Sequence, residues 1–110
     1  MEAGFSINVA NFISISYDNH IKFEYDGQKS RSNQEKHGIS FEEAKVLWKS
    51  PHVMVVTKWP IEQRFMLVGK VGDKFYSCFF TIRSSDVVRL ISVRRSRKSE
   101  KEKYYEKYED

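Results

Sequence analysis

Arginines are the side chains of this sequence best suited to chemistry on phosphate. Five of them stand within or at the ends of segments with strand-forming composition: Arg64, Arg83, Arg89, Arg94 and Arg95. A guanidinium stays protonated, and its planar fork binds two phosphate oxygens at once. Arginines that converge on one sheet can therefore hold an RNA backbone or stabilise charge that develops on a phosphoryl group. Taken singly, each is more often an exposed or ion-paired strand residue.

Two of these arginines, Arg89 and Arg94, are five positions apart in one predicted strand. Side chains of a regular strand alternate between its two faces, so the two arginines would lie on opposite faces. They can serve one site only if the strand contains a bulge or ends before Arg94.

A histidine, two glutamates and a tryptophan are further candidates. His37 can exchange a proton near neutral pH, although a histidine at a helix end is about as often a cap or packing residue. The carboxylates of Glu24 and Glu62 are possible bases, with an ordinary surface charge as the commoner role. Trp59 follows Lys58 in a predicted loop and can stack on a base, whereas Trp48 and Cys78 are expected in the core.

Motifs for other chemistries are absent from the sequence. There is no glycine-rich phosphate loop, no H-E-x-x-H and no G-x-S-x-G, and the three histidines are not spaced with carboxylates as metal ligands are. We therefore expect neither a metal nor a nucleotide cofactor.

Composition indicates one basic globular domain. The chain has 110 residues, of which 40% are hydrophobic, with a net charge of +4 that favours an anionic partner: RNA, DNA or an acidic protein. Cys78 is the only cysteine, so no internal disulfide or multi-cysteine zinc site is possible, and a reducing, cytoplasmic location fits. We expect no signal peptide and no membrane association.

Local signals predict a helical corner after a short strand at 21–25. Asp26 can cap a helix over 28–37 that Gly38 ends, and Ser40 with Glu43 forms a capping box that opens a second helix over 41–48. This corner would place Lys36 and His37 at the end of the first helix.

Alternating patterns follow at 53–58, 64–71, 74–82 and 87–94, and a closing helix is expected over 97–108. The order predicts an α+β domain: a small, mostly antiparallel sheet of about four strands, with two N-terminal helices and a C-terminal helix packed on it. Residues 21–110 would form this single domain. Residues 1–20 are an N-terminal extension that can be an extra strand or a disordered leader.

The sequence resembles the BrnT toxins, part of the broader RelE-like ribonuclease toxins of bacterial type II toxin-antitoxin systems. The K-H-G-x-S-F-E-x-A and R-x-I-S-x-R blocks occur together, and the resemblance covers about residues 21–105. The matching residues are F-E-Y-D at 23–26, Lys29, Asn33, K-H-G-I-S-F-E-E-A at 36–44, Pro51, Arg64, Gly69, T-I-R at 81–83 and R-L-I-S-V-R-R-S at 89–96, with Glu100 and Tyr104.

The resemblance implies a hydrolase: a metal-independent endoribonuclease that inhibits growth and is neutralised by a BrnA-type antitoxin. The antitoxin complex would form an oligomer and would contact operator DNA through the antitoxin. In this hypothesis a 2′-hydroxyl attacks the adjacent phosphate of bound RNA. The implied catalytic residues are His37, Arg64, Arg83 and Arg94; the expected RNA-binding residues are Lys36, Arg89, Arg95, Lys98 and Trp59.

One departure from the family pattern concerns the T-E-R triplet, which here is Thr81-Ile82-Arg83. A carboxylate that can act in acid-base chemistry is replaced by isoleucine. The alternative hypothesis is therefore an inactive homologue, a non-catalytic basic module that captures an antitoxin or RNA.

Overall fold

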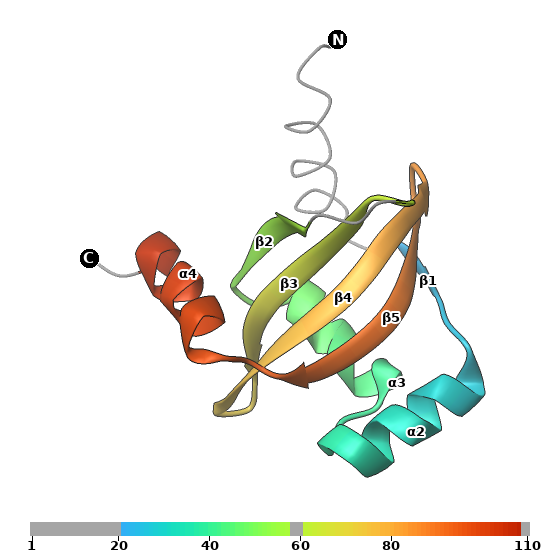
Figure 1. Cartoon of the computed structure of the whole chain (residues 1–110), viewed down its shortest axis with the longest axis horizontal. Helices are drawn as coiled ribbons and strands as arrows, with labels where there is room; N and C mark the ends of the chain where they lie inside the picture. Colours follow the sequence, from blue (N-terminus) through green and yellow to red (C-terminus); the bar gives the residue numbers. More distant parts are fainter. Residues whose placement is uncertain (1–20, 58–60, 109–110) are drawn as a thin grey trace, which may run out of the picture.

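The structure, a computed structural model, describes residues 21–57 and 61–108, so Trp59 and the extension before residue 21 lie outside its described part. Five strands form one sheet in the order β1-β5-β4-β3-β2 (Figure 1). Their bounds are β1 Lys22–Glu24, β2 His52–Thr57, β3 Arg64–Val71, β4 Lys74–Ser84 and β5 Val87–Arg95.

The α+β class is confirmed, but the prediction of about four mostly antiparallel strands is wrong in detail. Strands β2 to β5 form the predicted antiparallel meander, and β1 adds a fifth strand that pairs with β5 in parallel. A parallel partner is possible because two helices and three strands separate β1 from β5, which leaves ample chain for a crossover.

The predicted caps of the helical corner are confirmed. Helix α2, Gly27–His37, begins after Asp26, whose carboxylate accepts hydrogen bonds from the N–H groups of Gln28 and Lys29. Gly38 ends the helix with φ of 77°, a conformation that glycine adopts without steric cost. Ser40 and Glu43 then form the complete capping box.

The second predicted helix divides into two short pieces. Helix α3 covers Phe41–Ala44, and the chain then tightens into a 3₁₀ turn, η2, over Lys45–Trp48. Residues at the end of η2 pack against the sheet, where Leu47 and Trp48 are both buried. Gly69 permits this close approach, since a side-chain Cβ there would lie 3.2 Å from Cδ2 of Leu47 and 2.9 Å from the carbonyl oxygen of Pro51, just after η2.

The main core lies between α2, α3 and η2 and one face of the sheet. Trp48 contacts Phe23 of β1 and Phe80 of β4 in edge-to-face geometry, with ring centroids 5.1 Å apart in each pair. Cys78 is buried in this core, as predicted, and burial raises the pKa of its thiol.

Helix α4, Lys98–Tyr108, covers part of the opposite face (Figure 1). Tyr104 packs there with Met66, Val68 and Phe75, beside β2 and β3. None of the described helices covers the rest of this face, toward the start of β3 and the end of β4, where the candidate site lies. None of the helices within 21–57 and 61–108 has the length and apolar character needed to cross a membrane.

Candidate active site

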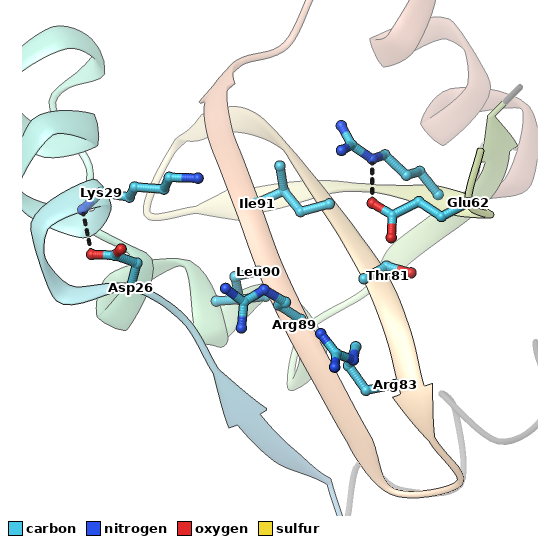
Figure 2. A pocket seen from close by; sticks show the side chains of 9 residues that line it. Asp26, Lys29, Glu62, Thr81, Arg83, Arg89, Leu90 and Ile91 are labelled. Atoms are coloured by element: carbon cyan, nitrogen blue, oxygen red, sulfur yellow. Dashed lines mark hydrogen bonds and ion pairs between the residues drawn. The ribbon is translucent and has the colours of Figure 1, made fainter. Parts of the chain in front are cut away.

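A cavity of about 140 Å³ lies on the uncovered part of the sheet, next to the first turn of α2. Its charged lining comes from distant parts of the chain, and Figure 2 shows these side chains gathered around β4 and β5. The lining residues are Asp26, Lys29, Glu62, Arg64, Thr81, Arg83, Arg89, Leu90 and Ile91.

Strand register explains why the arginines meet. Phe65 of β3 pairs with Phe80 of β4, and both point into the helix-covered core, so the neighbouring Arg64 and Thr81 point to the other face. Thr81 in turn pairs with Arg89 of β5. One row of side chains across three strands thus carries Arg64, Thr81 and Arg89.

Irregularities in the ladder between β4 and β5 shape the site. The register shifts between Ile82 and Ser84, so Arg83 is an extra residue in the strand where it lines the cavity. A second shift falls between Phe79 and Phe80, whose partners are Ser92 and Leu90, which makes Ile91 the extra residue in β5. Bulges of this kind redirect side chains and occur often beside functional sites.

The Glu62–Arg64 segment is fixed by several hydrogen bonds. The Nε of Arg64 lies 3.1 Å from Oε2 of Glu62 in an ion pair, drawn in Figure 2. The hydroxyl of Thr81 donates to the carbonyl of Gln63 at 2.8 Å, and that of Thr57 donates to the carbonyl of Arg64 at 2.8 Å. These bonds therefore fix the start of β3 to β2 on one side and to β4 on the other. They also fix the cavity wall that carries Glu62.

The opposite wall comes from α2, and Asn33 fixes that helix to the sheet. Its side-chain amide donates to the carbonyls of Val93 at 2.7 Å and Ile39 at 2.9 Å, and its oxygen accepts from the N–H of Val93 at 3.2 Å. All three bonds are buried, so the polar atoms of Asn33 that face the sheet are paired, as buried polar groups usually are. The result is a defined position for Lys29 at the cavity.

The charge of the cavity suits an anion. Four cationic side chains line it, Lys29, Arg64, Arg83 and Arg89, against the two carboxylates of Asp26 and Glu62. The Asp26 carboxylate caps α2, and Glu24 forms a 3.4 Å ion pair with Arg89 at the β1 side. Arginines from three strands aimed at one small space can grip a single phosphate through several oxygens.

Arg94 takes a different place from the one predicted. The bulge at Ile91 does bring Arg94 to the same face as Arg89, but the two lie five residues apart along β5, about 16 Å at strand spacing. Arg94 forms a two-pronged ion pair with Glu100 of α4, at 2.9 and 2.8 Å. It does not line the cavity.

Other predicted site residues are dispersed. Lys36 and His37 are exposed at the C-terminal end of α2, about 16 Å along an 11-residue helix from its cavity end. Arg95 lies over the Tyr76 ring at 5.8 Å, on the helix-covered face, and Lys98 is exposed at the start of α4. Of the nine residues predicted for catalysis or RNA binding, the cavity brings together Arg64, Arg83 and Arg89.

Lys29 and Thr81 were not among the predicted site residues, and Glu62 was weighed mainly as a surface charge. A sequence signal exists for two of them. Lys29 is three positions after the helix cap at Asp26, and Glu62 is two positions before a strand-opening arginine. The pairing of Thr81 with Arg89 depends on the sheet register and has no local signal.

Ile82 lies away from the cavity. Its side chain packs against the core cluster on the helix-covered face, as alternation from Thr81 requires. A glutamate at this position would begin on the same face, opposite the arginines.

The fold and the site define a class: a small α+β protein with an arginine-lined cavity on an exposed part of its sheet. The chain belongs to the BrnT family, described as the ribonuclease toxin of type II toxin-antitoxin systems, since the family model matches residues 25–100. The family predicted from the sequence is confirmed.

A solved structure supports the fold. The crystal structure of the Brucella abortus ribonuclease toxin BrnT matches with a TM-score of 0.56 at 22% identity, over 71% of this chain and 99% of that one. At this identity the likeness concerns the fold alone. A comparison with curated proteins returns no match.

Proposed function

We propose that this toxin-family protein is a metal-independent endoribonuclease whose active site is the arginine cavity. The observation that carries the proposal is the convergence of Arg64, Arg83 and Arg89 from three neighbouring strands on one space of about 140 Å³. Positioned guanidinium groups supply the positive charge that a pentavalent phosphorane needs. The family's description as ribonuclease toxins supports RNA as the substrate class.

In the proposed reaction the 2′-hydroxyl of one nucleotide attacks its own 3′-phosphate. The new bond joins the 2′-oxygen to phosphorus, and the bond from phosphorus to the 5′-oxygen of the next nucleotide breaks. The 2′-hydroxyl proton passes to the Glu62 carboxylate, and the departing 5′-oxygen takes a proton from Lys29. The products are a 2′,3′-cyclic phosphate and a 5′-hydroxyl.

The arrangement of the two proton-transfer groups supports these roles. Figure 2 shows Lys29 and Glu62 extending toward Ile91 from opposite sides of the view, with Arg83 and Arg89 lower down, and all five residues line the cavity. In-line displacement places the attacking and leaving oxygens on opposite sides of phosphorus, so a base and an acid are needed on opposite sides. His37 and Arg94 have no part in this step.

The position of Ile82 favours the enzyme over the alternative of an inactive binding module. Because Ile82 packs on the helix-covered face, its presence does not remove a carboxylate from among the arginines. The carboxylate that we assign as the proton acceptor, Glu62, lies just before β3 and is present in this chain.

The remaining roles follow from family membership and charge. A BrnA-type antitoxin would neutralise the toxin in the bacterial cytoplasm, and operator DNA would be bound through the antitoxin in their complex. The net charge of +4 suits both an RNA substrate and an acidic partner segment.

The test is incubation of the purified protein with RNA in EDTA, followed by analysis of the RNA ends. We expect cleavage without added metal and fragments ending in 2′,3′-cyclic phosphate. The matched control is the Arg83→Ala variant purified in the same way. Cleavage that requires a divalent cation, or fragments with 5′-phosphates, would contradict the mechanism.

A further inference from the structure

Within residues 21–57 and 61–108, no other strand pairs with the outer edge of β2. Strand β2 ends the sheet on one side, and its sequence from Val53 to Thr57 contains no proline and no charged residue. Such residues usually protect sheet edges from pairing with other chains. The opposite edge differs, because β1 has only three residues and includes Lys22 and Glu24.

Hydrogen bonds at His52 show which backbone groups of β2 face outward. The His52 N–H donates to the Tyr108 hydroxyl at 2.9 Å, and the His52 carbonyl accepts from Tyr108 at 2.7 Å and Lys107 at 3.0 Å. Outward and inward groups alternate along an antiparallel strand. The N–H and C=O groups of Met54 and Val56 therefore also point outward, while those of Val53 and Val55 pair with β3.

The end of α4 thus caps the first outward position of β2, and no described residue pairs with the next two. Beside them lies a groove of about 520 Å³ between α4 and β2, lined by residues 53–56 and by Lys103, Glu106 and Lys107. Val56, a large apolar residue of the same strand, is 54% exposed. The groove therefore combines apolar side chains of β2, outward backbone groups that no described residue pairs with, and a rim with two lysines and one glutamate.

We propose that this edge is the docking site for an extended segment of the antitoxin. The segment would pair with Met54 and Val56 as a sixth strand, place apolar side chains over Val53 and Val55, and present a carboxylate to Lys103 and Lys107. The net positive rim selects an acidic strand over a second copy of this basic chain. The inference rests on the antitoxin partnership and is independent of the cleavage mechanism.

Hydrogen exchange tests the pairing directly, using the full chain alone and in complex with the protein encoded beside the toxin gene. The Met54 and Val56 amides should exchange rapidly in the free toxin and at least tenfold more slowly in the complex. The Val53 and Val55 amides are an internal control, because their bonds to β3 protect them in both states. Slow exchange of Met54 and Val56 in the free chain would show another occupant and overturn the proposal.

A pair of variants at one position gives the second test. Val56→Pro removes an outward N–H and blocks strand addition, but edge positions tolerate proline. We expect it to weaken the complex at least tenfold, whereas Val56→Thr retains wild-type affinity. If Val56→Pro does not fold, the exchange experiment decides.

Two results distinguish a failure of the proposed docking site from a failure of the antitoxin partnership on which it rests. No complex between the wild-type toxin and the neighbouring gene product would defeat both the antitoxin partnership and this docking site. A stable complex with unchanged exchange at Met54 and Val56 would defeat the docking site alone.

Discussion

Arg94 and Glu100 join the end of β5 to helix α4 through two hydrogen bonds of 2.9 and 2.8 Å. Glu100 also accepts from the Ser77 hydroxyl and the Arg97 N–H, and Arg94 stacks over the Phe79 ring at 5.1 Å. The bonds from Arg94 and Ser77 hold α4 on the sheet, and the bond from Arg97 closes the first turn of the helix. Arg94, which the sequence predicted to be catalytic, thus has structural partners at this position.

The first prediction concerns this ion pair. Glu100→Gln leaves Arg94 partly buried without its anion, so we expect a loss of about 3 kcal/mol in the free energy of unfolding. Urea unfolding measures it, with Glu102→Gln on the exposed side of the same helix as the control. Equal stability of the two variants would show that the pair contributes nothing.

The same carboxylate predicts a pH dependence of stability. Burial alone would raise the pKa of Glu100, but hydrogen bonds from Arg94, Arg97 and Ser77 outweigh it and hold the value at about 2. Ionised Glu100 therefore stabilises the fold fully above about pH 4.5, and this contribution disappears as the pH falls from 4.5 toward 2. Glu100→Gln should flatten this part of the stability profile.

The second prediction concerns the cavity arginines. Arg83→Ala or Arg89→Ala removes a guanidinium positioned for the phosphate, and each should slow RNA cleavage on the order of a hundredfold. Stability should change little for Arg83, which is exposed on a bulge. Arg95→Ala is the matched control, since Arg95 lies on the other face. If Arg95→Ala slowed cleavage as much as Arg83→Ala does, the activity would not depend on the cavity.

The third prediction concerns Glu62 as the proton acceptor. Glu62→Gln keeps the shape and the hydrogen-bonding oxygen but cannot take a proton, so the cleavage rate should fall at least tenfold with RNA binding retained. Single-turnover rates measure the loss, and RNA binding is measured in parallel. An unchanged single-turnover rate would assign the base to another group.

The sequence predicted the local features of this fold because they depend on neighbouring residues. Caps at Asp26, Gly38 and Ser40 act over three or four positions, and the strand patterns of β3 and β4 are continuous. The parallel pairing of β1 was not predictable in this way. It depends on contacts such as Phe23 with Trp48 and on Asn33 with Val93, 60 positions apart.

The sequence indicated which type of residue lines the site, but not which individual residues come together there. The sequence singled out arginines on strands, and three of them line the cavity. Their grouping depends on the strand register, which includes two bulges that no turn residue marks, at Arg83 and Ile91. His37 is the opposite case, because its local structure was predicted but its position relative to the cavity was not. Its helix end was correctly predicted, but the cavity lies at the other end of that helix. Element boundaries do not specify which end faces a site.

The fourth prediction tests the position that departs from the family pattern. Ile82→Glu restores the family carboxylate on the helix-covered face, where Ile82 packs against the core. A charged group replacing a partly buried isoleucine should cost about 1 to 3 kcal/mol of stability. The cleavage rate per folded molecule should stay within about threefold of wild type, because the new carboxylate points away from Arg64, Arg83 and Arg89. Ile82→Gln, which adds the same shape without charge, is the control for packing. A cleavage rate raised tenfold or more in Ile82→Glu but not in Ile82→Gln would show that this position acts in catalysis and that Glu62 does not suffice.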